Sequence, residues 1–252
     1  MSESYYRNKS VLITGAGKRG RVGAQIAEHF GRVGAHVIIH FRTGEAEARE
    51  VEALIKSVAP DAHVSLISGD LSKPEDVARI FTNFKPDIVI NNAAVFEAAK
   101  IADGMSLFDK LKAHNDTLTK NLDANVRSTE LVSRAAIDML QRSKKSGVIV
   151  MIGDAFIDRG GTYPEELTAY TASKSHIPAV VAMLGRAYGK DGIRVLGVLN
   201  GTIEPPPSAP RETIEHMQDE VALPKEVLTP WIGGKAVAQA IDNLIRTEAA
   251  NG

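Results

Sequence analysis

Tyr170 and Lys174 are a pair of side chains that could carry out acid–base chemistry. They lie four residues apart in the segment Tyr170-Thr-Ala-Ser-Lys174, which has the apolar periodicity of a helix. Because residues i and i+4 share one face of a helix, we expect the phenol and the ammonium to point into the same cleft. A nearby ammonium favours phenolate, so it should hold the pKa of Tyr170 below its usual ~10. Such a phenol could give or take a proton.

A glycine-rich segment, Thr14-Gly-Ala-Gly-Lys-Arg-Gly-Arg-Val-Gly23, follows the first predicted strand and opens the first helix. Glycines permit a tight turn and let the backbone approach a pyrophosphate, which sits on the helix N-terminus. Such a turn is a weak signal alone, and its place at the first strand-to-helix junction strengthens it. We therefore predict cofactor contacts from Gly15, Lys18, Arg19, Gly20, Arg21 and Val22.

The end of the second predicted strand indicates which dinucleotide binds. His40-Phe-Arg-Thr43 holds no carboxylate that could accept the ribose hydroxyls of NAD. Arg42 suits the 2′-phosphate of NADP(H) instead, although it could simply be a solvated side chain at a strand end. Ligands of open α/β sheets bind along the carboxyl edge, so further contacts are predicted at His40, Asp70, Leu71, Asn92, Ala93, Ala94 and Gly201.

Alternating strands and helices must position these residues. Short, nearly continuous apolar runs predict buried strands at residues 11–13, 37–39, 64–67, 88–90, 148–152 and 195–199. Amphipathic segments between them predict helices at 24–33, 45–58, 74–84, 116–140 and 168–188, with a final helix near 234–247. The alternation predicts an α/β fold with a doubly wound parallel sheet of the Rossmann type. We expect one domain over 1–252, with a proline-rich lid segment near 200–230.

Composition excludes several classes of protein. The 252 residues include 30 Lys+Arg and 31 Asp+Glu, a net charge of −1 that offers no basic surplus for nucleic acid. With no cysteine there is no disulfide or thiolate metal site, and the seven histidines show no ligand spacing, so we expect no metal. No apolar run has the length of a membrane span or signal peptide. These features favour a cytoplasmic protein.

From about residue 10 to 201 the chain resembles the short-chain dehydrogenase/reductase family, through Thr14-Gly15, Asn91-Asn-Ala-Ala94, Asn125, Tyr170-x-x-x-Lys174 and Ile193-Arg-Val195. The resemblance implies that Tyr170 is the proton donor or acceptor. It implies that Lys174 lowers the pKa of Tyr170 and binds the nicotinamide ribose. It also implies that Asn125 holds a proton-relay water, with Asn121 a less well-placed rival.

The main departure from that family is Asp154, where a serine is usual at the end of the fifth strand. Its spacing to Tyr170 is 16 residues, which predicts a short insertion within 156–166, and Asp158 is a rival carboxylate. An Asp here is similar to the pteridine and dihydromonapterin reductases, in which a residue at the place of Phe96 stacks the pterin. To donate a hydrogen bond Asp154 must be protonated; burial would raise its pKa and Lys174 would lower it.

The resemblance implies an NADPH-dependent oxidoreductase that reduces a C=O or C=N bond of a small-molecule substrate, with a pterin-like heterocycle favoured. A 3-oxoacyl or other ketone reductase is the alternative within the family. A non-catalytic NADP-binding sensor is a third possibility, which retention of Tyr170, Lys174 and Asn125 argues against. The resemblance implies a homodimer or homotetramer; Asn200-Gly201 in place of Pro-Gly and the absence of the customary Asp-Gly-Gly ending depart from the family pattern.

Overall fold

The computed structural model describes residues 3–158, 163, 165–201 and 233–247, so the predicted lid lies outside the described residues. Its centre is one parallel sheet in the order β3-β2-β1-β4-β5-β6. The strands are β1 (Ser10–Ile13), β2 (His36–Phe41), β3 (Val64–Ser68), β4 (Ile88–Asn91), β5 (Gly147–Asp154) and β6 (Ile193–Asn200). The order reverses between β1 and β4, which confirms the predicted doubly wound, Rossmann-type sheet.

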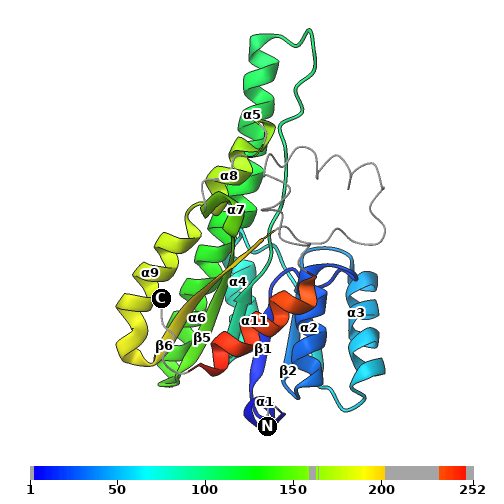
Figure 1. Ribbon diagram of the computed structural model, residues 1–252, viewed down its shortest axis with the longest axis vertical. Coiled ribbons are helices and arrows are strands. Elements are labelled where there is room, and N and C mark those ends of the chain that lie inside the picture. The colour runs from blue at the N-terminus through cyan, green and yellow to red at the C-terminus, as the bar shows by residue number, and fades with distance from the viewer. Residues whose placement is uncertain (1–2, 159–162, 164, 202–232, 248–252) are drawn as a thin grey trace, which may run out of the picture.

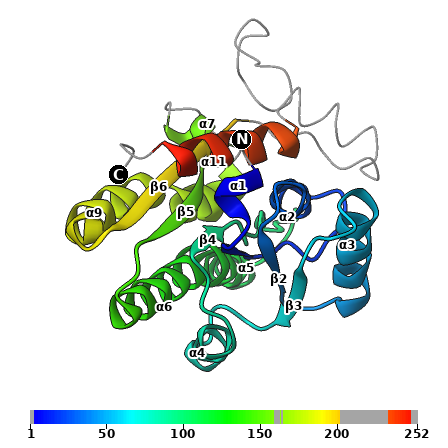
Figure 2. The ribbon, with the colours of Figure 1, turned by 90° about the horizontal axis from the view of Figure 1, so that it is seen from below.

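Two apolar cores cover the two faces of the sheet (Figure 2). One face packs on α2 (Val22–Arg32), α3 (Glu45–Val58) and α11 (Gly234–Arg246). The other packs on α4 (Pro74–Asn83), α6 (Ser128–Ser143) and α9 (Ile177–Tyr188). Alternate strand residues divide between the cores: Ile13 faces the first and Leu12 the second. Because both faces are covered, the strands read as continuous apolar runs.

The predicted helix 168–188 is two helices, α8 (Thr168–Lys174) and α9, separated at Ser175 and His176. Pro178 lies in the first turn of α9, where its missing N–H costs nothing. In the middle of one continuous helix the same proline would remove a hydrogen bond and clash with the preceding turn. A short helix that was not predicted, α1 (Glu3–Tyr6), lies ahead of β1.

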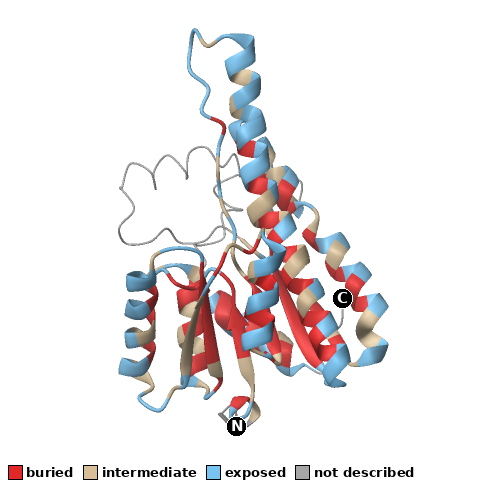
Figure 3. Cartoon of the chain, turned by 180° about the vertical axis from the view of Figure 1, so that it is seen from behind, coloured by how far each residue is buried: buried red, intermediate tan, exposed pale blue. Residues whose placement is uncertain are grey.

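A long helical column lies along one face of the sheet and extends beyond it (Figure 1). It consists of α5 (Leu107–Asn121), the π-helical segment η1 (Leu122–Arg127) and α6, so it begins nine residues earlier than the predicted 116–140. Ser106 caps α5 by accepting from the backbone N–H of Asp109 at 3.1 Å. Most of α5 is exposed where it projects from the body (Figure 3).

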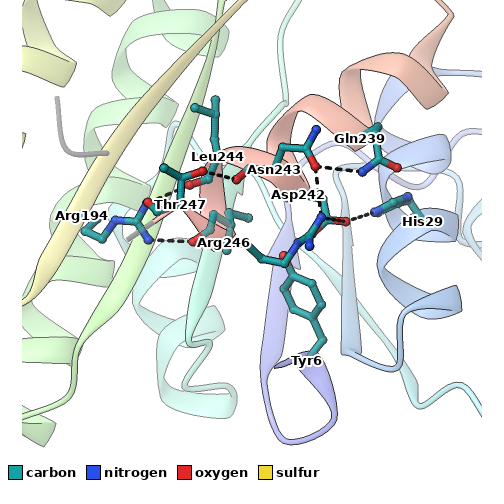
Figure 4. Close-up of polar contacts among 10 residues, drawn as sticks. Tyr6, His29, Arg194, Gln239, Asp242, Asn243, Leu244, Arg246 and Thr247 are labelled. Atoms are coloured by element: carbon teal, nitrogen blue, oxygen red, sulfur yellow. Dashed lines mark hydrogen bonds and ion pairs between the residues drawn. The ribbon is translucent and has the colours of Figure 1, made fainter. Parts of the chain in front are cut away.

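Polar contacts anchor α11 at its C-terminal half (Figure 4). The buried carboxylate of Asp242 accepts from Tyr6 Oη at 2.7 Å and Arg246 Nε at 2.8 Å, and lies 3.0 Å from His29 Nε2. Arg194 of β6 donates to the carbonyls of Leu244, Ile245 and Thr247. Its positive charge therefore lies at the C-terminal end of α11, where the helix dipole is negative. The last helix is thereby joined to α1, α2 and β6.

Candidate active site

The glycine-rich turn between β1 and α2 packs directly against the segment that follows β4. Gly15 has φ +65°, and a Cβ on it would lie 2.8 Å from the Cα of Ala93. The Thr14 hydroxyl accepts from the backbone N–H groups of Asn92 and Ala93, each at 2.9 Å. The Asn92 amide donates back to the carbonyl of Thr14 at 2.8 Å. The two predicted cofactor segments therefore meet at one edge of the sheet, and only glycine fits at position 15.

His40 is buried and supports this turn from β2. Its Nδ1 accepts from the N–H of Gly15 at 3.2 Å, so its Nε2 carries the proton and donates to the carbonyl of Gly69 at 3.1 Å. Burial lowers the pKa of His40 to about 4. Both ring nitrogens are thus used by backbone groups. The predicted cofactor contact of His40 would have to be made through the turn that it holds.

The cationic side chains predicted around the cofactor are exposed at this edge: Lys18, Arg19, Arg21 and Arg42. Arg21 is the N-cap residue of α2 and its side chain makes no cap, which leaves the first N–H groups of α2 directed at the same edge. Hydrogen bonds from Ser72 lower the pKa of Asp70, and the Arg42 charge acts in the same direction. Leu71 is buried in the second core. Gly20 and Val22 are half-buried.

Asp154 and Tyr170 meet at the carboxyl end of β5. Tyr170 donates its phenolic hydrogen to Asp154 Oδ2 at 2.9 Å, and each residue is only 9% exposed. A second phenol, Tyr163, donates to the same oxygen at 3.0 Å. Asp154 Oδ2 therefore acts as a hydrogen-bond acceptor toward both phenols. The rival Asp158 ends α7 (Ala155–Asp158) and is exposed.

Burial, and next the charge of Asp154, raise the pKa of Tyr170. The direction predicted from the spacing to Lys174 is therefore wrong for this structure. Lys174 Nζ donates to the carbonyl of Ile152 at 3.0 Å, and burial lowers its own pKa to about 8. Tyr170 and Lys174 lie on one helix, α8, but the Asp154 carboxylate on β5 affects the pKa of the phenol more than the ammonium does. Tyr170 is held as a protonated donor.

Asn125 lies in η1 and is almost completely buried. Its amide nitrogen donates to Ser173 Oγ at 2.8 Å and to the carbonyl of Val95 at 3.0 Å, and its oxygen accepts from the N–H of Val95 at 2.8 Å. Ser173 lies between Tyr170 and Lys174 in the sequence of α8, so the hydrogen bond to Ser173 joins Asn125 to the helix that carries the pair. The rival Asn121 instead donates to the carbonyls of Glu97 and Thr117. A π-helical segment often marks a functional site.

Phe96 is 54% exposed and stands beside the phenols. Its ring centroid lies 4.5 Å from that of Tyr170 at an interplanar angle of 68°, and 6.0 Å from that of Tyr163 at 75°. Tyr163 and Tyr170 are also edge to face, 5.7 Å apart. The ring of Phe96 is therefore exposed beside the two phenols rather than part of the core.

Tyr163 is the residue that sequence reasoning missed. It falls in the predicted insertion, and its only sequence signal was that a phenol occurs seven residues before Tyr170.

On the neighbouring strand, Asn200 is in register with Asp154. Asn200 Oδ1 is buried and has no hydrogen-bond partner among the described residues, while Nδ2 donates to the carbonyl of Gly201 at 3.0 Å. Ala94 is exposed beside Asn92.

No group of three or more His, Cys, Asp or Glu side chains among the residues that the structure describes could hold a metal ion. Within the same residues, no helix has the length and apolar character needed to cross a membrane.

Two curated relatives are dehydrogenases. A 3beta-hydroxysteroid dehydrogenase 1 of Eggerthella lenta is 28% identical over 208 residues, 81% of this chain and 74% of the relative. Glucose 1-dehydrogenase 2 of Bacillus subtilis is 26% identical over 201 residues, 77% of this chain and 72% of the relative. Their names refer to a steroid and a sugar, so the predicted similarity to pteridine reductases stays a prediction.

Crystal structures show the same fold. A structure from Sinorhizobium meliloti, assigned as a short-chain alcohol dehydrogenase, has a TM-score of 0.75 at 21% identity and covers 97% of this chain and 92% of its own. A structure from Agrobacterium tumefaciens, assigned as a 2-deoxy-d-gluconate 3-dehydrogenase with bound NADP, has a TM-score of 0.71 at 22% identity and covers 94% and 88%. Residues 15–249 match a family model described as Enoyl-(Acyl carrier protein) reductase. The chain belongs to the short-chain dehydrogenase/reductase family.

Proposed function

We propose that this chain is an NADPH-dependent oxidoreductase that reduces a C=O or C=N bond of a small substrate, with Tyr170 as the proton donor. The observation that carries the proposal is the placement of Tyr170. Its phenol is protonated, nearly buried, and held by Asp154 beside the exposed ring of Phe96. A bound nicotinamide supplies the hydride in such a reaction.

The residues around Tyr170 have distinct roles in this proposal. As the substrate oxygen or nitrogen gains an electron pair, the O–H bond of Tyr170 breaks and a new bond to that atom forms. Lys174, one helical turn away, is a cation whose lowered pKa of about 8 lets it exchange a proton near neutral pH. Asn125 keeps Ser173 and the segment after β4 in place behind the pair.

The described residues fit a dinucleotide. A Cβ at Gly23 would lie 2.5 Å from the Asn92 side-chain nitrogen, so position 23 of the turn has no room for a side chain. The uncapped start of α2 and the exposed cations suit a pyrophosphate. Arg42 at the end of β2 suits a 2′-phosphate, and the Agrobacterium relative in fold binds NADP. These features support NADP(H) over NAD(H).

Two substrate classes remain candidates for the same site. Asp154 and the exposed Phe96 favour a flat, nitrogen-bearing heterocycle such as a pterin, because the ring offers a stacking face and the carboxylate accepts hydrogen bonds. The steroid and sugar dehydrogenases among the relatives favour a ketone. A non-catalytic sensor has less support, because a binding module needs no buried proton donor.

The decisive experiment compares the wild type with Tyr170→Phe, using NADPH oxidation against a panel of pterins, ketones and imines. Removing only the hydroxyl should keep NADPH binding while turnover falls by ~10²–10⁴-fold. Tyr188→Phe is the matched control, since Tyr188 ends α9 and its hydroxyl accepts from Arg134. Turnover of Tyr170→Phe close to that of the wild type would refute the assigned proton donor.

We also propose that the chain forms a homo-oligomer through α5. Leu107, Leu111 and Leu118 are 74%, 59% and 40% exposed, and Leu122 in η1 continues the same stripe. At about 100° per residue the three α5 leucines lie within roughly 40° around the helix axis. A projecting helix with such an apolar stripe is typical of an association surface. The occupant that fits is the same stripe of a second copy, across a two-fold axis.

A further inference from the structure

Tyr163 contacts the site without belonging to the pair that the family motif contains. It lies between β5 and α8, in the stretch whose length sets this chain apart. Its hydroxyl reaches the same Oδ2 of Asp154 that Tyr170 uses, at 3.0 Å and 2.9 Å respectively. Its ring is edge-on to both Tyr170 and Phe96. The backbone nearby is held to the segment after β4, since Glu166 accepts from the N–H of Ala99 at 2.9 Å.

We infer that Tyr163 is a positioning residue for proton transfer, which by sharing Asp154 Oδ2 limits how tightly that oxygen holds the Tyr170 proton. The inference rests on the proposed function of Tyr170. In this inference the phenol of Tyr163 determines how readily the phenol of Tyr170 donates its proton.

The physical reason is competition for one acceptor. A carboxylate oxygen that accepts two phenols divides its negative charge between them, so each hydrogen bond is weaker than a single one would be. Without the Tyr163 hydroxyl, Oδ2 would interact more strongly with the Tyr170 proton. That proton would then be released less readily to the substrate. Burial and the Asp154 charge raise the pKa of both phenols, so both remain donors.

Lys174 is the cation whose charge acts across this cluster. Its interaction with Asp154 opposes the effect of burial on its own pKa. It reaches the Ile152 carbonyl from α8, whereas Tyr163 approaches Asp154 from the segment ahead of α8. Removing the Tyr163 hydroxyl therefore changes one donor on Asp154 and leaves the Lys174 contact in place.

The test is a double-mutant cycle between Tyr163→Phe and Asp154→Ala, measured with NADPH and whichever ketone or imine the wild type reduces. Losing one hydrogen bond predicts a kcat roughly three- to tenfold lower in Tyr163→Phe, with KM for NADPH unchanged. In the Asp154→Ala background the same change should have no effect beyond about twofold, because the shared oxygen is absent. Tyr188→Phe should match the wild type.

A second measurement separates this role from packing. If Tyr163 eases proton release, the solvent deuterium isotope effect on kcat should be larger in Tyr163→Phe than in the wild type. An unchanged isotope effect, or an equal loss of kcat in both backgrounds, would overturn the inference and leave Tyr163 a packing residue. Where Asp154→Ala is too slow to measure, the isotope effect decides alone. Wild-type turnover in Tyr170→Phe would instead refute the proposed function, and the inference with it.

Discussion

His40 makes the stability of this protein depend on pH in a way that can be calculated. The ring accepts from Gly15 through Nδ1 and donates to Gly69 through Nε2, so only the neutral form satisfies both backbone groups. A second proton on Nδ1 would face the N–H of Gly15. Burial accordingly lowers the pKa of His40 from 6.5 to about 4 in the folded protein.

The sign follows from proton uptake by the two states. Between about pH 6.5 and pH 4 the unfolded chain binds a proton at His40 and the folded protein does not. Stability therefore falls as the pH is lowered through that window and is fully present above it. The two pKa values differ by about 2.5, and each unit corresponds to about 1.4 kcal/mol, so the whole window is worth about 3 kcal/mol. Between pH 7 and pH 5 the loss should be about 2 kcal/mol.

The assay is urea unfolding of the wild type and His40→Gln at several pH values from 7 to 5. Glutamine keeps a donor and an acceptor but does not titrate. All other groups titrate alike in both proteins, so the difference between the two free energies of unfolding isolates His40. We expect that difference to shrink by about 2 kcal/mol as the pH falls. Two curves that stay parallel to within about 0.5 kcal/mol would show that His40 is not held neutral.

Three further perturbations have expected outcomes. Arg42→Ala should weaken the binding of NADPH by about 1.5–3 kcal/mol and the binding of NADH far less, as measured by fluorescence titration. Equal losses for both cofactors would show that Arg42 does not bind the 2′-phosphate. Asp242→Ala removes the acceptor of Tyr6 and Arg246 and should cost about 3–5 kcal/mol in urea unfolding, whereas a cost under about 1 kcal/mol would contradict the anchoring of α11. Leu111→Asp should convert an oligomer into a monomer in light scattering, and an unchanged mass would exclude the α5 stripe.

The sheet could be predicted because its strands are covered on both faces. Runs such as residues 148–152 contain only apolar residues, a pattern typical of strands that are buried on both faces. The alternation of these strands with helices then predicted that they are parallel. The split between α8 and α9 was missed because the periodicity continues through it, although Pro178 was a local signal for a break. The long start of α5 was missed because its leucines face outward and resemble no core pattern.

The sequence placed the candidate site residues along the chain, but it did not contain the electrostatics that the structure gives them. Spacing on one helix was enough to bring Tyr170 and Lys174 together, and family resemblance supplied Asn125. The direction of the Tyr170 pKa depended on burial and on a carboxylate from another strand, which spacing along the chain does not contain. The contact of Tyr163 with Asp154 likewise depends on the folded structure and not on spacing along the chain. Which cofactor and substrate bind stays a prediction.

The attachment of α11 has a consequence for engineering the segment between Gly201 and Gly233. Arg194 on β6 and Asp242 on α11 hold the end of the chain to the body through contacts that lie outside residues 202–232. Segments of other lengths could therefore be grafted between Gly201 and Gly233 while the sheet and the last helix keep their own anchorage. Doubling the length of such a graft should cost only about 0.6 kcal/mol in closure entropy. We therefore expect exchange of this segment between family members to leave the described part of the fold intact.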